Sequence, residues 1–281
     1  MKKIFERNHT IKTGKVILAG AGPGDPELIT IKAARYLQQA DVVLTDRLVS
    51  EEILNKYVRK DADIIYVGKQ CRSGNSTSQQ TINELLLDYA IQGKFVVRLK
   101  GGDVSVFSNI MDELEILVAN NIPFEIIPGV TAALGAAAYS GIPLTARGYS
   151  TAVRFLTYYK SDIVTDEYWK ELANTTDTLV FYMSSETLDR VVEKLIANNI
   201  ATEKTMAVIE QATTPLQNVH IASLYEYEKK LKGRTFISPS LVIIGRVVAL
   251  HQQFAWLANN YSKENYFKPV EEVIQKIKLS A

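Results

Sequence analysis

The chain reads AGAGPGDPELIT at residues 19–30, directly after an apolar run at residues 16–18. The three alternating glycines of this stretch allow close approach of a ligand to the backbone and permit positive φ angles. Pro23 and Pro26 stiffen the same turn and remove backbone N–H donors. The combination predicts a rigid ligand-binding loop that joins a strand to a helix.

The loop partly matches the dinucleotide fingerprint G-x-G-x-x-G, which also needs an acidic residue about 20 positions later. Gly20 and Gly22 fit the first half, and Asp46 follows a second apolar run at residues 42–44. Asp25 stands where the third glycine belongs, and its charge would oppose a pyrophosphate at a helix N-terminus. Two alternatives stay open on this motif alone, a nicotinamide-dependent oxidoreductase and a plain strand–turn–helix without a ligand.

Composition narrows the classes of function. The 281 residues suit one large or two modest domains, and 47% hydrophobic residues suffice for a full core. The formal net charge of +1 gives no indication of nucleic-acid or membrane binding. One cysteine excludes an internal disulfide, and three scattered histidines predict no metal site. We find neither a secretory signal nor an apolar run of membrane-spanning length, so we expect a cytoplasmic protein.

Strand and helix patterns alternate along the chain, which predicts an α/β fold. In the first half the predicted strands are 16–20, 42–46, 63–67, 95–99 and 123–127, and the predicted helices are 27–39, 50–57, 78–91, 108–120 and 130–140. In the second half the predicted strands are 152–157, 177–182, 205–211, 217–222 and 239–246, and the helices are 166–173, 185–198 and 249–258. Several later strands lie too close together for a crossover helix, so we expect a mainly parallel first sheet and a mixed second sheet.

A Gly/Pro break at residues 140–145 sets the predicted domain boundary. We expect, in chain order, a flexible arm at 1–13, an N-terminal α/β domain at 14–144, a C-terminal α/β domain at 145–258 and a tail at 259–281. Clefts between domains are favoured ligand sites, so we expect the active site in the interdomain cleft.

Polar and glycine-rich motifs follow several of the predicted strands. In open α/β sheets, ligands bind outside the carboxyl ends of the strands. The motifs at such ends are the loop 20–25, Asp46, Lys69, the segment 101–103 and Thr131. Asp46 is a candidate general base and Lys69 a candidate general acid, provided that their surroundings shift their pKa values. Exposed loop charges are the plain alternative for both residues.

This set of motifs resembles the tetrapyrrole methylase family. The matching segments are GAGPGDPELIT, VVLTDRLVS, VGK, VVRLKGGD, PGVTAALGAAAYSGIPLT, LVFYM, ATTP and SPSLVIIGRVVAL, in the family's order over residues 14–250. Within the family, the chain resembles uroporphyrinogen-III C-methyltransferases more than the later precorrin methylases. The resemblance implies two α/β domains, a homodimer and S-adenosylmethionine in the interdomain cleft. It also implies methylation of uroporphyrinogen III at carbons 2 and 7 to precorrin-2, for sirohaem or cobalamin biosynthesis.

The resemblance assigns roles to individual residues. The implied cofactor-binding residues are Pro23, Gly101, Gly102, Asp103, Val106, Thr131, Ala132, Met183 and Ala212. Asp46 and Lys69 match the residues proposed as proton acceptor and proton donor. By position alone, the cations expected to bind the substrate's carboxylates are Arg47, Lys100 and Arg147.

The chain departs from the family pattern over residues 104–111 and at two further positions. Asn109 stands in place of an arginine, Ala146 in place of a histidine, and Ser184 in place of a glycine. These changes lie near the tetrapyrrole side, so they bear on substrate and rate more than on cofactor or fold. A methylase of another tetrapyrrole and a non-catalytic S-adenosylmethionine-binding protein therefore stay open beside the oxidoreductase.

Overall fold

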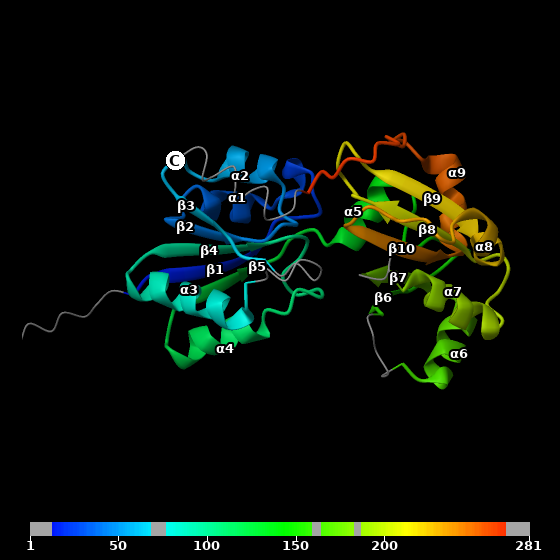
Figure 1. Ribbon diagram of the computed structural model, residues 1–281, viewed down its shortest axis with the longest axis horizontal. Coiled ribbons are helices and arrows are strands. Elements are labelled where there is room, and N and C mark those ends of the chain that lie inside the picture. Colours follow the sequence, from blue (N-terminus) through cyan, green and yellow to red (C-terminus); the bar gives the residue numbers. More distant parts are fainter. Residues whose placement is uncertain (1–12, 69–76, 159–163, 183–186, 268–281) are drawn as a thin grey trace, which may run out of the picture. The chain divides into compact units, whose positions relative to one another are not determined.

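The computed structural model describes residues 13–68, 77–158, 164–182 and 187–267 (Figure 1). The remaining residues include nearly all of the expected N-terminal arm, Lys69, Met183, Ser184 and the end of the expected tail. Within the described part of the chain, no helix is long and apolar enough to cross a membrane.

Backbone contacts divide the described chain into two compact units, 13–21 with 29–129 and 22–28 with 130–267. The second unit therefore begins earlier than the expected boundary at residue 144. The reason is helix α5 (Ala132–Tyr139), whose alanines pack against the second sheet rather than the first. The turn at 22–28 belongs to the same unit, so the opening motif contributes residues to both units.

The first unit holds a five-stranded parallel sheet in the order β3-β2-β4-β1-β5. Its strands are β1 (Lys15–Gly20), β2 (Val42–Thr45), β3 (Asp63–Tyr66), β4 (Phe95–Lys100) and β5 (Phe124–Ile127). Its helices are α1 (Ile31–Leu37), α2 (Glu51–Tyr57), α3 (Gln79–Ile91) and α4 (Met111–Ala119). The expected parallel sheet is thereby confirmed.

Helices cover both faces of this sheet, as the alternation of side chains along its strands requires. Ile17 and Val97 pack with α1 and α2 in one core cluster. Val16 and Val96 point the other way and pack with α3 and α4 in a second cluster. Figure 1 shows the two helix pairs on opposite sides of the strands.

The second unit holds a mixed five-stranded sheet in the order β6-β7-β10-β8-β9, in which only β6 and β7 run parallel. Its strands are β6 (Val153–Thr157), β7 (Thr178–Tyr182), β8 (Thr205–Glu210), β9 (Asn218–Ser223) and β10 (Ser240–Gly245). The expected mixed sheet is confirmed.

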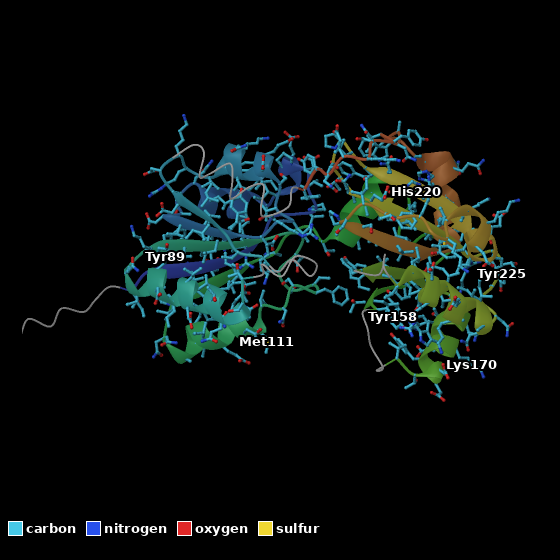
Figure 2. All side chains as sticks on the ribbon, viewed as in Figure 1. Tyr89, Met111, Tyr158, Lys170, His220 and Tyr225 are labelled. Carbon is cyan, nitrogen blue, oxygen red and sulfur yellow. The ribbon has the colours of Figure 1, made fainter. Side chains whose placement is uncertain are left out.

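Helices α6 (Asp166–Asn174) and α7 (Leu188–Ala197) pack on one face of this sheet with the short α8 (Tyr227–Lys230). In that cluster Tyr158, labelled in Figure 2, meets Trp169 edge-on with ring centroids 5.3 Å apart. Helix α5 covers the other face together with the 3₁₀ segment at 246–250, which leads into α9 (His251–Phe254).

The helices predicted at 27–39 and 108–120 begin later than expected, for reasons that the structure shows. The helix predicted at 27–39 is a 3₁₀ turn at 26–28 followed by α1, because the Thr30 side chain caps α1 by accepting from Ala33 N. Asp25 caps only that 3₁₀ turn, through its bond from Glu27 N. The helix predicted at 108–120 begins at Met111, because Phe107 and Asn109 have positive φ angles that no α-helix accommodates.

Candidate active site

The strand-end motifs of the first unit lie at one edge of its sheet. The parallel register pairs Gly20 with Lys100 and Thr45 with Leu99, so β1, β2 and β4 end side by side. Asp46 and Gly101 are the next residues after two of these strands. The structure thus brings Asp46 and the 101–103 segment to the same sheet edge, the expected place for a ligand.

Three backbones meet closely at this edge. A Cβ on Gly129 would lie 2.3 Å from the Gly102 carbonyl oxygen, and a Cβ on Gly20 would lie 2.6 Å from the same oxygen. Gly102 itself has a φ of +71°. No side chain fits between these backbones. Glycine at positions 20 and 129 therefore allows the loops that follow β1 and β5 to pack directly against the loop after β4.

Asp103 links two of the same loops by hydrogen bonds. Its Oδ1 accepts from the backbone N and the hydroxyl of Ser105, and its Oδ2 accepts from Gly129 N at 2.9 Å. Burial would raise the pKa of the Asp103 carboxyl, but the hydrogen bonds from Ser105 and Gly129, with a further one from Val106 N, hold it below its usual range. Asp103 therefore joins the β4 loop to the β5 loop, whatever it does for a ligand.

We expect Asp103→Asn to lower the free energy of unfolding by about 1–3 kcal/mol near pH 7, because a buried ionic acceptor is lost. The folded-state pKa is lowered, so the carboxylate's contribution is present above the unfolded-state pKa and is lost as pH falls through the folded-state pKa. Urea unfolding should therefore show the difference between variant and wild type shrinking as the pH falls below the unfolded-state pKa of the carboxyl and through its lowered folded-state pKa.

The matched control for that measurement is Asp61→Asn, since the Asp61 side chain is 78% exposed in a surface pair with Arg59. It should change stability by no more than about 0.5 kcal/mol. A deficit in Asp103→Asn that stays constant across the pH range would contradict the role of its charge.

Asp46 is half-buried, and its Oδ1 accepts from Leu48 N at 2.9 Å. This bond orients the carboxylate at the end of β2. Arg47 is also half-buried beside it. Lys69, the predicted proton donor, lies outside the described residues, so the pairing of Asp46 with Lys69 stays a prediction.

A buried ion cluster lies next to these loops. The Glu113 side chain is fully buried and accepts from Arg98 Nε and from Lys100 Nζ, each at 3.0 Å. Arg98 also donates to the Leu44 carbonyl at 3.2 Å. Burial lowers the pKa of Lys100, and Arg98 lowers it further, while the Glu113 and Asp46 charges raise it. The Lys100 ammonium is therefore paired with the Glu113 carboxylate. This geometry does not support the expectation that Lys100 binds substrate carboxylates.

In the second unit, the turn at 22–28 packs against α5. A Cβ on Gly135 would lie 2.6 Å from Pro23 Cγ, so this glycine makes room for the proline ring. The Tyr139 hydroxyl donates to Asp25 Oδ2 at 2.6 Å, and Asp25 N donates to Thr213 Oγ1 at 3.2 Å. The two expected cofactor segments around Pro23 and Ala212 are therefore joined within one unit.

The N-terminus of α5 is capped by a side chain from β7. Thr131 Oγ1 and the Tyr182 hydroxyl share a hydrogen bond of 2.7 Å, and Ala133 N donates to the same hydroxyl at 3.0 Å. No sequence pattern indicates a role for Tyr182, because the pairing joins residues about 50 positions apart. The Tyr182 side chain of β7 thus positions Thr131 and Ala132. Met183, the next residue after β7, lies outside the described residues.

The loop after β8 contains Ala212 between two residues with left-handed backbones, Gln211 at φ +48° and Thr213 at φ +66°. Ala212 is 8% exposed. Non-glycine residues hold such φ angles only where their surroundings impose them, and they gather at functional sites. Arg147, by contrast, is exposed on a tight turn closed by the pairing of Ala146 with Ser150.

The predicted residues can be tested for their fit to a sulfonium nucleoside. Gly101 and Gly102 are half-exposed and offer backbone without side chains, and Val106 and Ala132 are half-buried and apolar. Each of these neutral groups is chemically compatible with contact to a flat base or a cationic sulfur. Among the described residues, no group of three or more His, Cys, Asp or Glu side chains is placed to hold a metal ion.

Comparisons with known proteins agree with this arrangement. The family model for Tetrapyrrole (Corrin/Porphyrin) Methylases matches residues 15–228. A sirohaem synthase of Saccharophagus degradans is 47% identical over 245 residues, which are 87% of this chain and 53% of that protein. The chain therefore spans about half the length of the curated relatives it matches.

Solved structures give the same result. A uroporphyrin-III C-methyltransferase of Thermus thermophilus, complexed with S-adenyl homocysteine, superposes with a TM-score of 0.68 at 35% identity. The match covers 84% of this chain and 93% of that one. A cobalt precorrin-4 methyltransferase superposes with a TM-score of 0.74 at 26% identity, over 83% and 95% of the two chains.

Proposed function

The chain belongs to the tetrapyrrole methylase family, and we propose that it transfers methyl groups from S-adenosylmethionine to uroporphyrinogen III. The products would be methylated at carbons 2 and 7, giving precorrin-2. The observation that carries the proposal is the joint presence, at the strand ends of both units, of the family's motifs in a chain 35% identical to a uroporphyrin-III C-methyltransferase.

In this proposal, loops of both units bind the cofactor. Gly101, Gly102 and Val106 would contact the cofactor from the first unit. From the second unit the contacts would come from Pro23, Thr131, Ala132, Met183 and Ala212. Asp103 contributes by fixing the shape of the glycine loop through its bonds to Ser105 and Gly129. The cleft that would hold the cofactor, the homodimer and the cytoplasmic location stay predictions.

Bound S-adenosylmethionine supplies an electrophilic methyl group, so the protein's main task is to align a nucleophilic pyrrole carbon with it. After attack, the macrocycle must lose a proton. Asp46 would accept it, because its Oδ1 is held by Leu48 N and its charge lies at the expected sheet edge. Lys69 is the proposed donor of a proton at the same edge. The proposed cationic partners of the substrate's carboxylates are Arg47 and Arg147.

The proposal predicts a specific product mass. The purified chain is incubated with S-adenosylmethionine and enzymatically made uroporphyrinogen III under anaerobic conditions, and the product is analysed by mass spectrometry. A gain of two methyl groups is expected. A chain that binds S-adenosylhomocysteine by calorimetry but adds no methyl group to this substrate would contradict it.

A second candidate is methylation of another tetrapyrrole. The observation that favours it is Asn109, which stands where the family has an arginine and has a positive φ of 51°. Its amide donates to Asp112 Oδ2 at 3.3 Å, so the segment before α4 supplies no cation at this position. Turnover of a precorrin substrate without turnover of uroporphyrinogen III would favour this candidate.

A further inference from the structure

Residues 255–267 follow α9 without a helix or strand and lie outside the segment matched by the family model. Their first part is fixed to β9. Asn259 Oδ1 accepts from Val219 N at 2.8 Å, and Asn259 Nδ2 donates back to the Val219 carbonyl at 3.0 Å. Tyr261 N donates to Asn218 Oδ1 at 2.7 Å. This segment, orange to red in Figure 1, is therefore an ordered part of the second unit.

The far part of the segment is bonded to the side chain of Gln211. Its Nε2 donates to the Glu264 carbonyl at 3.0 Å, and its Oε1 accepts from Tyr266 N at 2.6 Å. Gln211 is fully buried. A buried amide with both polar ends bonded to the backbone of a distant segment fixes that segment in one register.

The loop that Gln211 begins is bonded in turn to the turn at 22–28. Gln217 Oε1 accepts from Thr213 N at 2.8 Å, and Gln217 Nε2 donates to the Tyr139 carbonyl at 3.1 Å. Thr213 Oγ1 accepts from Asp25 N. A connected set of hydrogen bonds thus runs from Tyr266 to Asp25, entirely within the second unit.

We propose that Gln211 is a positioning residue, whose amide clasps residues 264–266 and thereby holds Ala212 and the turn at Asp25 in the shape that binds the cofactor. The inference rests on the proposed function, which assigns both segments to the cofactor. The left-handed backbones of Gln211 and Thr213 explain why a clasp is needed, since such conformations persist only where the surroundings impose them. The chain beyond the matched family segment is, on this account, part of the cofactor site's support.

The test removes hydrogen bonds of the clasp by substituting Gln211 in one variant and Tyr266 in another. Gln211→Leu removes the side-chain bonds to Glu264 and Tyr266, together with a 3.5 Å bond to the Leu216 carbonyl. Tyr266→Pro removes only the N–H that Gln211 Oε1 accepts from. Calorimetry with S-adenosylhomocysteine should show binding weakened about tenfold in each variant, the equivalent of one or two lost hydrogen bonds. The double variant should bind no more weakly than the weaker single variant, because both substitutions remove one link.

Steady-state kinetics separates positioning from catalysis. Both variants should raise the KM for S-adenosylmethionine about tenfold and leave kcat within about twofold, because the clasp shapes the loop and touches no reacting atom. Hydrogen exchange of the cofactor-free variants should be faster at residues 211–217 and at 264–266, and unchanged in β1 and β4.

Asn259→Ala is the matched control. It removes two hydrogen bonds between the same segment and β9 but none to the loop, so cofactor affinity should stay within about twofold of wild type. The inference is overturned if the wild-type chain binds and both clasp variants bind equally well, or if Asn259→Ala weakens binding as much as they do. If the wild-type chain does not bind S-adenosylhomocysteine, the proposed function is overturned instead. In that case, unchanged hydrogen exchange at residues 211–217 and 264–266 in the variants would overturn the clasp by itself.

Discussion

Replacing Glu113 by glutamine is expected to lower the free energy of unfolding by about 3–5 kcal/mol at neutral pH, the cost of leaving buried charges without their partner. The Glu113 side chain is fully buried, and those of Arg98 and Lys100 are only 5% and 8% exposed. Glutamine keeps the shape of the side chain and an oxygen acceptor. It removes the single negative charge that two buried cations share, and it turns an N–H donor toward one of them.

A second substitution tests whether charge causes the loss. Lys100→Met leaves one cation on Glu113, so it should cost less than Glu113→Gln. Combined with Glu113→Gln, it removes a cation that would otherwise be unpaired, and the double variant should be more stable than the sum of the two single effects. Urea unfolding of the four proteins measures this coupling. Strict additivity, or a loss below about 1 kcal/mol in Glu113→Gln, would contradict a charge-based role.

The pH dependence of the stability deficit in Glu113→Gln gives an independent test of the role of the Lys100 charge. Burial lowers the pKa of Lys100 in the folded chain, and loss of the Glu113 charge lowers it further. As pH rises through that lowered pKa, the unfolded chain binds more protons than the folded chain, so stability rises with pH. The deficit of Glu113→Gln should therefore shrink as the pH is raised from neutral toward the ordinary lysine pKa. A deficit that grows over this range would assign the loss to something other than the buried ammonium.

The sheet and its loops were predictable because their signals are local. Apolar runs such as 16–18 and 42–44 alternate with helix patterns, and this alternation suffices for a parallel sheet. Parallel strands then place Asp46 and Gly101 at one edge by geometry alone. These parts of the site needed no knowledge of side-chain packing.

The roles of Lys100 and Tyr182 depended on contacts that local patterns do not encode. Arg98 and Lys100 alternate along a strand and so share a face, and Glu113 lies four residues before the buried Leu117 on α4. An acidic residue in that inward position was the available signal for a buried ion cluster. Tyr182 capping Ala133 and Gln211 clasping Tyr266 join distant segments, and no spacing rule in the sequence indicates either contact.

Substitution of Asp46 by asparagine is expected to lower turnover about 10²- to 10⁴-fold, the range for loss of a general base. The carboxylate sits at the end of β2, with Oδ1 held by Leu48 N. An asparagine side-chain oxygen still accepts that bond, so the loop keeps its shape while the side chain loses its capacity to accept a proton at neutral pH. Calorimetry with S-adenosylhomocysteine should give an affinity within about twofold of wild type.

A carboxylate at the other end of the same strand supplies the control. Asp41 precedes β2, where its Oδ1 pairs with Arg59 at 2.9 Å and its Oδ2 accepts from Phe95 N at 2.8 Å. Asp41→Asn removes one negative charge from the same sheet but from the edge opposite the expected site, so turnover per folded molecule should be nearly unchanged. Because the two aspartates lie at opposite ends of β2, equal losses in both variants would assign the effect to the sheet's stability. Normal turnover in Asp46→Asn would remove this residue from proton transfer and leave the methyl transfer to positioning alone.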